Sequence, residues 1–556
     1  MPKMKAAYAL METLLKLGVK VIFGNPGSSE VGFMEAVEKY PEIDFVLGLH
    51  EGAVIGMAEG YARASRTPAV TNVHIAPGLA NSLNMIYDAY RGNTPIIITA
   101  GQQDQRFMIK EPMLTADLVN MARPFTKWSY EVYTAKEIPL AIVRAYKTAI
   151  EPPAGPVFLS LPENLLAKEE EFDIEVFPFL NFSMSPPKDS LDIAASLIID
   201  ANHPVIIGGD GIWECNAQEE LIKFADLIGA EVYSMPLISQ YIFPSSHPLY
   251  FGNLGFGPIN IKKALNDSDL IIIFGMPLFN QITFVPKEGV QKRQKIIHFD
   301  LNIERIGRNF PQTIGIPGDI KKGLNELNEI LSSKIDNEKR KFLDQRKKKR
   351  EKERDKRRKK KKEVLKQLFN KTPISIPRLF YEINELKDSN TAIVDESISY
   401  MTPVHDYIDF SHSNSYFGLR GGGLGFGIPA AIGVKLALPD INVVALVGDG
   451  SALYTIQGLW SAAHLNLPVK YIILNNRSYR IVKINMIKYG GKKVKFTGMD
   501  LKPPLVDFIS VAKGFNVDAK HVESPDKLKD ALLWLFNNDR PSLLDVVVDP
   551  SYGDLF

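Results

Sequence analysis

The sequence predicts an α/β protein built from three domains with doubly wound parallel sheets. Short apolar runs alternate with stretches of helical spacing in three parts of the chain, which is the pattern of βαβ units. Polar residues or glycines follow many of these runs, as they do at the ligand-binding edge of a parallel sheet. The 556 residues are enough for three domains of ordinary size. We expect domains over residues 1–165, 185–335 and 369–556, with a basic linker or helix over 336–368.

The composition is that of a soluble globular protein. Hydrophobic residues make up 45% of the chain and charged residues 23%, and the net charge is +2. A charge this small implies no overall attraction to nucleic acid or to a membrane, and no apolar run approaches the roughly 18 residues of a membrane span. The single cysteine, Cys215, cannot form an internal disulfide, which fits the reducing cytoplasm where we expect the protein.

Apolar runs in the first third predict four parallel strands, each followed by polar residues or glycine. The strands are expected over residues 19–23, 45–49, 69–73 and 96–99, with helices over 6–17 and 53–64. Glu51 follows the second run and precedes an apolar helix, so we expect it to be buried. A buried carboxyl is suited to share a proton with a ring nitrogen, although a helix N-terminal glutamate can also satisfy backbone N–H groups.

The last third contains the most specific motif. An apolar run over residues 443–447 is followed by Gly448-Asp449-Gly450-Ser451, a helix expected over 451–465, and a second apolar run over 469–474 that ends at Asn475-Asn476. In such a βαβ unit, Asp449 and Asn476 lie at the carboxyl ends of two parallel strands. Carboxylate, amide and backbone oxygens suit Mg²⁺, and the glycines let backbone N–H groups approach a phosphate. The alternative is an ordinary strand–turn–helix with a capping aspartate.

The middle of the chain predicts a second Rossmann-like domain followed by a basic segment. Strand–turn signals occur over residues 204–211, 270–275 and 296–300, without a clean dinucleotide-binding fingerprint. Residues 340–366 are dominated by Lys and Arg, whose long side chains favour a solvated helix or a partly mobile linker. The alternative is an electrostatic patch for nucleic acid or an acidic partner. Phe342 is the only aromatic residue in this segment, and no nucleic-acid-binding module is recognisable.

These motifs resemble the family of thiamine diphosphate (ThDP)-dependent 2-oxo acid decarboxylases and acetolactate synthases, and within it the benzoylformate decarboxylases most closely. The GDGS sequence and the Asn-Asn pair are similar to the family's diphosphate-and-Mg²⁺ motif. Residues 23–28, Glu51, His74, 99–103 and 127–131 resemble the N-terminal pattern of the decarboxylases. The resemblance implies a pyrimidine-binding first domain, a central scaffold domain and a last domain that binds diphosphate and Mg²⁺.

The resemblance also implies roles for individual residues. Catalysis falls to Glu51, His74 and Ser28, of which Ser28 also binds the substrate carboxylate. The implied Mg²⁺ ligands are Asp449, Asn476 and Ser478, the last through its backbone carbonyl. Cofactor contacts are implied for Glu51, Ser399, Gly422, Leu424, Gly448, Gly450, Ser451 and Tyr479.

Two positions depart from the decarboxylase pattern. Ile282 stands where that pattern has a second catalytic histidine, and Ile481 stands where an aryl-accepting relative has a smaller residue. Isoleucine cannot transfer a proton, so Gln281 or His74 takes over that role or the chemistry differs. Because the branched Ile481 leaves less room for a phenyl group, we expect Ser28, Ile282 and Ile481 to line a pocket that favours a small or branched aliphatic 2-oxo acid.

The sequence therefore predicts a ThDP- and Mg²⁺-dependent lyase that decarboxylates a 2-oxo acid to an aldehyde and CO₂. One alternative is a carboligating enzyme similar to acetolactate synthase or 2-hydroxyacyl-CoA lyase, and another is a ThDP-binding or interaction protein without catalysis. Since Glu51 and Asp449 lie on different domains, the resemblance implies a homodimer as the minimal active unit and a homotetramer as the full assembly. We expect neither a membrane nor a nucleic acid as a partner.

Overall fold

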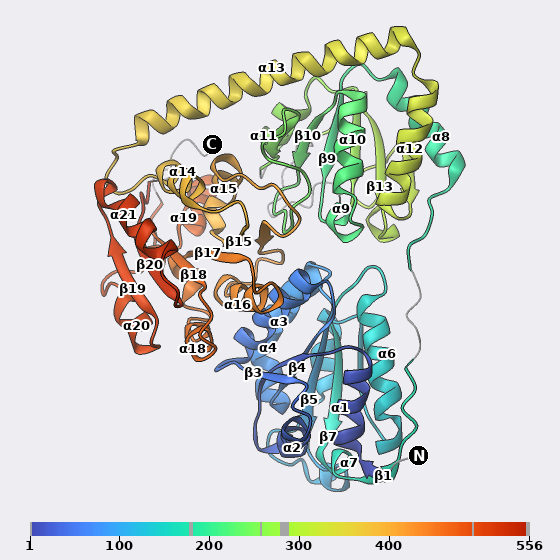
Figure 1. The fold of residues 1–556 in the computed structure, drawn as a ribbon, viewed down its shortest axis with the longest axis vertical. Coiled ribbons are helices and arrows are strands. Elements are labelled where there is room, and N and C mark those ends of the chain that lie inside the picture. Colours follow the sequence, from blue (N-terminus) through green and yellow to red (C-terminus); the bar gives the residue numbers. More distant parts are fainter. Residues whose placement is uncertain (1–2, 177–181, 256–257, 278–288, 492–493, 552–556) are drawn as a thin grey trace. The chain divides into compact units, whose positions relative to one another are not determined.

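The computed structural model describes residues 3–176, 182–255, 258–277, 289–491 and 494–551, and it divides the chain into two compact units (Figure 1). The first unit comprises Met1–Asn181, Asn390–Ile398 and Leu419–Phe556, and the second comprises Phe182–Ser389 and Ser399–Gly418. Three six-stranded sheets organise the fold. The predicted α/β class with three parallel-sheet domains is therefore confirmed.

The N-terminal part of the first unit alternates strands and helices. Its elements are β1 (Lys3–Lys5), α1 (Ala6–Lys16), β2 (Val21–Asn25), η1 (Ser28–Glu30), α2 (Val31–Lys39), β3 (Asp44–Leu47), α3 (Glu51–Ser65), β4 (Ala69–Val73), α4 (Ile75–Arg91), β5 (Ile96–Gln102), α5 (Leu118–Ala122), β6 (Trp128–Glu131), α6 (Ile138–Ile150), β7 (Val157–Pro162), α7 (Glu163–Leu166) and β8 (Glu169–Glu171). The large sheet has the order β3-β2-β4-β5-β7-β6, and its pairings are parallel. Every residue of β4 and β5 is buried, as expected for central strands of a parallel sheet.

The C-terminal part of the first unit repeats this architecture. Its elements are β15 (Thr391–Glu396), α16 (Gly427–Ala437), β17 (Asn442–Gly448), α17 (Asp449–Ala452), α18 (Gly458–His464), β18 (Lys470–Asn475), α19 (Arg480–Gly490), α20 (Phe508–Gly514), β19 (Asp518–Val522), α21 (Pro525–Phe536) and β20 (Ser542–Val547). The sheet order is β16-β15-β17-β18-β20-β19, in which β16 is Tyr416–Gly418. Strands β15, β17, β18, β20 and β19 pair in parallel, so their carboxyl ends share one edge.

Two small-residue helices, α3 and α16, join the two halves of the first unit. Their backbones touch: a Cβ atom on Gly60 would lie 2.1 Å from the carbonyl oxygen of Ala430, and one on Gly433 would lie 1.9 Å from that of Met57. Only glycine permits so close an approach. The contact fixes the position of α3, which begins at Glu51, relative to the loop that precedes α16.

The second unit contains the central sheet, of order β11-β10-β9-β12-β13-β14, whose pairings are also parallel. Its elements are α8 (Lys188–Asp200), β9 (Pro204–Gly208), α9 (Gly211–Glu214), α10 (Gln218–Ile228), β10 (Glu231–Ser234), β11 (Tyr250–Asn253), α11 (Pro258–Leu265), β12 (Leu270–Phe274), β13 (Lys295–Asp300), β14 (Ile314–Pro317), α12 (Ile320–Lys334), α13 (Asn337–Leu368), α14 (Ile376–Leu386) and α15 (Met401–Tyr407). Within the described ranges, no helix combines the length and apolarity needed to cross a membrane.

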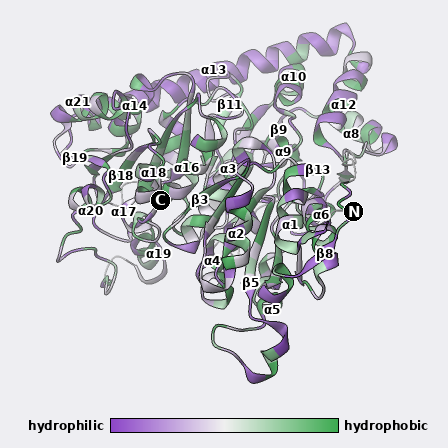
Figure 2. Ribbon diagram, turned by 60° about the horizontal axis from the view of Figure 1, so that its bottom comes forward, coloured by the Kyte–Doolittle hydropathy of each residue, from purple (hydrophilic) through white to green (hydrophobic). Residues whose placement is uncertain are grey.

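The basic segment forms a single helix, α13, which is almost entirely hydrophilic along its length (Figure 2). Asp336 caps its N-terminus by accepting a hydrogen bond from the backbone N–H of Lys339 at 2.7 Å. Leu343 and Leu365 are buried on one side of the helix. Most of the remaining residues are exposed, so α13 contacts the second unit with only one face.

The prediction of one continuous helix over residues 451–465 is wrong. α17 ends at Ala452, and α18 begins at Gly458. Between them the buried side chain of Thr455 donates a hydrogen bond to the carbonyl oxygen of Gly425 at 2.7 Å. This contact ties the intervening segment to the loop before α16, in competition with the helical hydrogen-bond ladder.

Candidate active site

Strand register places the predicted site residues of the first unit at the carboxyl ends of its two large sheets. In the N-terminal sheet, Asn25 at the end of β2 pairs with Val73 at the end of β4. In the C-terminal sheet, Gly448 at the end of β17 pairs with Leu474 of β18, so Asp449 is a neighbour of the residues that follow β18. This is the edge at which parallel α/β sheets bind ligands.

A buried carboxylate, Glu30, organises the N-terminal edge. Its side chain accepts hydrogen bonds from the backbone N–H of Gly27 at 2.9 Å and of Gly101 at 3.1 Å. Nδ1 of His74 lies 2.8 Å from Oε2 of the same carboxylate. The ionised carboxylate accepts a hydrogen bond from Nδ1–H, which keeps that proton on Nδ1 and leaves Nε2 as the imidazole nitrogen available for acid–base chemistry.

Ser28 and Glu51 lie at the same edge. Ser28 is exposed at the first position of η1, directly after the turn that follows β2. Glu51 is 7% exposed, as expected from its position in the sequence, and two amides hold it. Nδ2 of Asn25 donates to Oε1 at 3.1 Å, and Nδ2 of Asn81 donates to Oε2 at 2.9 Å. The carboxyl group is thus fixed in place without a cationic partner among these contacts.

The C-terminal edge offers oxygen ligands from one short loop. Asp449 is 3% exposed, and its Oδ1 accepts from the backbone N–H of Gly450 at 2.9 Å. Its Oδ2 has no hydrogen-bond partner within the part of the chain that the structure describes. Oδ1 of Asn476 accepts from the N–H and hydroxyl of Ser478. Burial raises the pKa of Asp449 to about 7. A buried carboxylate oxygen without a partner, beside an amide oxygen and a backbone carbonyl, fits a hard cation such as Mg²⁺.

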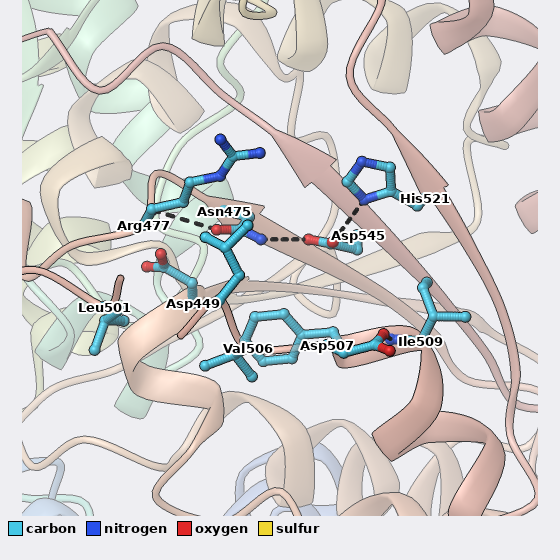
Figure 3. A pocket seen from close by; sticks show the side chains of 11 residues that line it. Asp449, Asn475, Arg477, Leu501, Val506, Asp507, Ile509, His521 and Asp545 are labelled. Atoms are coloured by element: carbon cyan, nitrogen blue, oxygen red, sulfur yellow. Dashed lines mark hydrogen bonds and ion pairs between the residues drawn. The ribbon is translucent and has the colours of Figure 1, made fainter. Parts of the chain in front are cut away.

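A pocket of about 230 Å³ lies next to Asp449 (Figure 3). Its polar wall is a hydrogen-bonded chain in which Nδ2 of Asn475 donates to Asp545 at 2.9 Å and Nδ1 of His521 lies 2.8 Å from the other oxygen of that carboxylate. The opposite wall is formed by residues 505–509 and is largely apolar. Asn475, the first residue of the Asn-Asn pair, therefore braces the strand ends, while Asn476 remains for the candidate metal site.

The glycine-rich loop before α16 is held by another buried carboxylate, Glu396. Its two oxygens accept from the backbone N–H groups of Gly425 and Gly427, each at 2.6 Å. Burial raises the pKa of Glu396 to about 7. In the same loop Gly422 has a φ of +86° and open space beside it, and the carbonyl of Leu424 accepts from Nδ2 of Asn84 at 2.8 Å.

The remaining predicted cofactor contacts surround Asp449. Gly450 packs against the ring of Tyr479, so closely that a Cβ atom there would lie 2.7 Å from the ring carbon Cε1. Ser451 is buried in the first turn of α17, and Gly448 caps that turn. Because Gly448 itself carries no side chain, a phosphate can approach the backbone at the start of α17 closely.

Three predicted residues lie outside the contacts described above. Ser399 belongs to the second unit, where it lies in η6 (Ile398–Tyr400). Ile282 lies outside the described residues, as does its neighbour Gln281. Ile481 is 38% exposed in the first turn of α19, two residues after Tyr479.

Four residues of the site had no role in the sequence interpretation: Glu30, Asn25, Asn81 and Glu396. Glu30 could have been found, because it stands three residues after Gly27 at a helix start, which is the spacing of a capping box. Asn81 and Glu396 act through contacts with segments far away in the sequence, so no local pattern identifies them.

Comparison with known proteins identifies relatives along the whole chain. Three family models match: the N-terminal TPP binding domain, the central domain and the C-terminal TPP binding domain of thiamine pyrophosphate enzymes, over residues 4–117, 191–327 and 399–546. A benzoylformate decarboxylase from Pseudomonas aeruginosa is 30% identical over 542 residues, which cover 97% of this chain and 98% of that protein. An acetolactate synthase large subunit from Haemophilus influenzae is 28% identical over 563 residues, covering 99% and 96%.

Solved structures show the same likeness along the whole chain. The crystal structure of benzoylformate decarboxylase from Polynucleobacter necessarius superposes with a TM-score of 0.86 at 26% identity, covering 98% of this chain and 99% of that chain. A thiamine diphosphate-dependent 4-hydroxybenzoylformate decarboxylase from Rhodococcus jostii also gives a TM-score of 0.86, at 27% identity, covering 99% and 100%.

Proposed function

Because the chain belongs to the family of thiamine diphosphate-dependent enzymes, we propose that it catalyses the Mg²⁺-dependent, non-oxidative decarboxylation of a 2-oxo acid to an aldehyde and CO₂. The observation that carries the proposal is the cluster at the N-terminal edge, where Glu30 orients His74 beside the turn that bears Ser28. Ser28 can bind the carboxylate of the substrate, and the imidazole of His74 can transfer a proton. A decarboxylase needs both groups in addition to its cofactor.

ThDP, when bound, supplies the nucleophilic carbon and the electron sink that the loss of CO₂ requires. Asp449, Asn476 and the carbonyl of Ser478 would hold its diphosphate through Mg²⁺, since they present oxygen ligands, of which Oδ2 of Asp449 has no hydrogen-bond partner among the described residues. The backbone N–H groups at the start of α17 would contact the phosphates directly.

The protein's own groups position substrate and protons. Glu51, held in place by Asn25 and Asn81, is the carboxyl group that would exchange a proton with the cofactor's pyrimidine ring. Ser28 donates a hydrogen bond to the substrate carboxylate. In the doubly protonated form of His74, Nδ1 donates to Glu30, while Nε2 donates to the carbonyl oxygen of the substrate and gives up its proton once CO₂ has left, which returns the ring to neutral imidazole.

The substrate in this proposal is a small or branched aliphatic 2-oxo acid. Ile481 lies on the first turn of α19 next to Tyr479, and its partly exposed, branched side chain narrows the space available to an aryl group. The relative rates of aldehyde formation from pyruvate, 3-methyl-2-oxobutanoate and benzoylformate test this point. A clear preference for benzoylformate would overturn the assignment of substrate but leave the decarboxylase proposal standing.

Carboligation is the second candidate, because acetolactate synthases from several organisms match 98% or more of the chain at 27–28% identity. A synthase transfers the bound acyl fragment to a second carbonyl compound instead of protonating it. Incubation of the enzyme with pyruvate alone, and with pyruvate plus 2-oxobutanoate, separates the two reactions. Acetaldehyde as the main product supports the decarboxylase, and an acetohydroxy acid as the main product supports the synthase.

We also propose that two copies of the chain form the active unit. Apolar side chains that are substantially exposed lie close in sequence to the site residues: Leu49 precedes Glu51, and Val482 follows Ile481. Ile109 and Met113, in the loop after β5, are exposed to 91% and 85%. Apolar groups of this kind favour a partner surface. Light scattering during size-exclusion chromatography would return the mass of a dimer or tetramer, and an active monomer would refute the proposal.

A further inference from the structure

The inner face of α13 holds the helix to the second unit through a regular stripe of basic side chains. Arg346 donates to the carbonyl oxygens of Ile228 and Ala201, both at 2.9 Å, at the C-terminal ends of α10 and α8. Arg350 pairs with Glu231 at 2.8 Å. These positions are four residues apart, so they lie on one side of the helix.

The stripe continues along the second half of α13. Arg354 donates to the carbonyl oxygen of Ser245 at 3.2 Å, and Lys361 pairs with Asp406. Arg357 lies over the ring of Phe251, 4.7 Å from its centroid. The whole helix is therefore anchored, which keeps its opposite face turned away from the second unit.

The outer face of α13 is defined here as its exposed Lys and Arg residues that form no ion pair with any described carboxylate, without Arg357, which lies over Phe251 on the inner face. They are Arg340, Lys341, Lys348, Lys349, Lys352, Lys356, Arg358, Lys359, Lys360, Lys362 and Lys366. The exposed acidic residues of α13 are far fewer: Glu338, Asp344, Asp355 and Glu363. Like charges at this spacing repel one another and destabilise a helix, so this face does not serve the fold.

We propose that the outer face of α13 binds the phosphate backbone of double-stranded nucleic acid without reading its sequence. The helix is 32 residues long, and from Arg340 to Lys366 it presents a straight row of cations about 39 Å in length. A duplex is the polyanion with matching rigidity, since it carries a charge about every 1.7 Å of its axis. The net charge of +2 predicts no attraction of the whole protein to nucleic acid. The outer face of α13 differs, because positive charge is concentrated on one exposed surface.

Other kinds of partner fit the outer face of α13 less well than a duplex does. A single strand would call for aromatic stacking, but Phe342 is the only aromatic residue of α13 and lies against Lys339 and Arg346. A membrane surface would call for apolar side chains that insert, and the outer face has none. A stable protein interface would call for a central apolar or aromatic anchor, which is also lacking there.

The test is a salt titration of the full-length protein with a fluorescein-labelled 24-base-pair duplex of random sequence, followed by anisotropy. The variant carries four substitutions on the outer face: Lys348→Gln, Lys352→Gln, Lys356→Gln and Lys359→Gln. The matched control replaces four exposed lysines elsewhere, as Lys20→Gln, Lys513→Gln, Lys527→Gln and Lys529→Gln, with the same change in net charge. We expect both proteins to fold, because no anchoring residue of α13 is altered, and thermal melting of each checks this.

We expect the wild-type protein and the control to bind the duplex with a dissociation constant on the order of 10⁻⁶ to 10⁻⁴ M near physiological salt. The outer-face variant should bind more weakly, and the slope of log K against log salt should fall by about 4, one for each phosphate that a lysine no longer neutralises. Equal weakening in variant and control would overturn the proposal, because net charge would then suffice. Binding to anionic vesicles or to polyglutamate but not to the duplex would also overturn it.

Discussion

Nδ1 of His74 lies 2.8 Å from Oε2 of Glu30, inside a cluster that also takes in the backbone N–H groups of Gly27 and Gly101. Three strand ends, those of β2, β4 and β5, thus converge on one carboxylate. Because Glu30 is 1% exposed and fully hydrogen-bonded, it can set the orientation of the imidazole rigidly. Gly27 also packs directly against the imidazole and restricts its position, since a Cβ atom on Gly27 would lie 2.1 Å from Nδ1 of His74.

Replacing Glu30 with glutamine should lower kcat for decarboxylation, because the amide no longer fixes the proton on Nδ1 of His74. We expect a loss of at least about tenfold, within the roughly 10²- to 10⁴-fold that general acid–base catalysis contributes. Steady-state kinetics over a range of pH measure the effect, and Glu38→Gln on the exposed face of α2 serves as control. An unchanged pH profile of kcat in Glu30→Gln would contradict the orienting role.

Substitution of Glu51 by glutamine should abolish most of the turnover but leave the fold intact. The amide keeps an oxygen for one of the two asparagines, Asn25 and Asn81, but cannot exchange a proton with the cofactor. We expect kcat to drop by about 10²- to 10⁴-fold while the melting temperature changes little. If the variant kept wild-type activity, Glu51 would be a structural helix-terminal residue only.

Removal of the candidate Mg²⁺ ligand should uncouple the protein from its cofactor. Saturating ThDP with Mg²⁺, at about 100 times the dissociation constant, is expected to stabilise the wild-type protein by about 2.7 kcal/mol. Differential scanning fluorimetry should show a rise in melting temperature that is lost in Asp449→Asn and retained in the exposed control Asp440→Asn. A rise of equal size with ThDP in the presence of excess EDTA would argue against a metal at this position.

The contact between α3 and α16 should not tolerate a methyl group. In Gly60→Ala the new Cβ meets the carbonyl oxygen of Ala430, and overpacking of this kind costs about 1–3 kcal/mol. Gly514→Ala is the matched control, because a Cβ there has nothing within 4 Å and its backbone is not left-handed. Chemical denaturation measures both free energies of unfolding. A neutral Gly60→Ala would show that the two helices are not packed backbone to backbone.

The buried carboxyl group of Glu396 should make the free energy of unfolding depend on pH. Its pKa is raised by burial from 4.5 to about 7, so between these values the folded state binds more protons than the unfolded state. This group's contribution to stability therefore falls as the pH rises from about 4.5 to about 7, by about 3 kcal/mol in total. Denaturation at several pH values should show a difference between the wild-type protein and Glu396→Gln that varies with pH in this window and is constant below it.

Local patterns in the sequence predicted the parallel strands and the edge at which the site lies, because β5, β17 and β18 each contain a continuous apolar run that ends in polar residues or glycine. The same patterns failed where distant segments decide the conformation. Residues 451–465 look like one helix, but the hydrogen bond from Thr455 to Gly425 breaks it.

The partners of the site residues were also beyond local prediction. Asn81 reaches Glu51 from α4, and Glu396 holds the glycine loop thirty or so residues further along the chain, about which spacing says nothing. The basic segment shows the same limit. Its composition predicted a helix or a linker, but only the contacts of Arg346 and Arg354 reveal which of its faces is anchored.

The most direct test of the proposed function is the release of CO₂ from 3-methyl-2-oxobutanoate by the purified protein, with identification of the organic product by NMR. The proposal predicts CO₂ and 2-methylpropanal in equal amounts, dependent on added ThDP and Mg²⁺ and lost in Glu51→Gln. No CO₂ from this acid, pyruvate or benzoylformate under these conditions would contradict it, as would release that persists undiminished in Glu51→Gln.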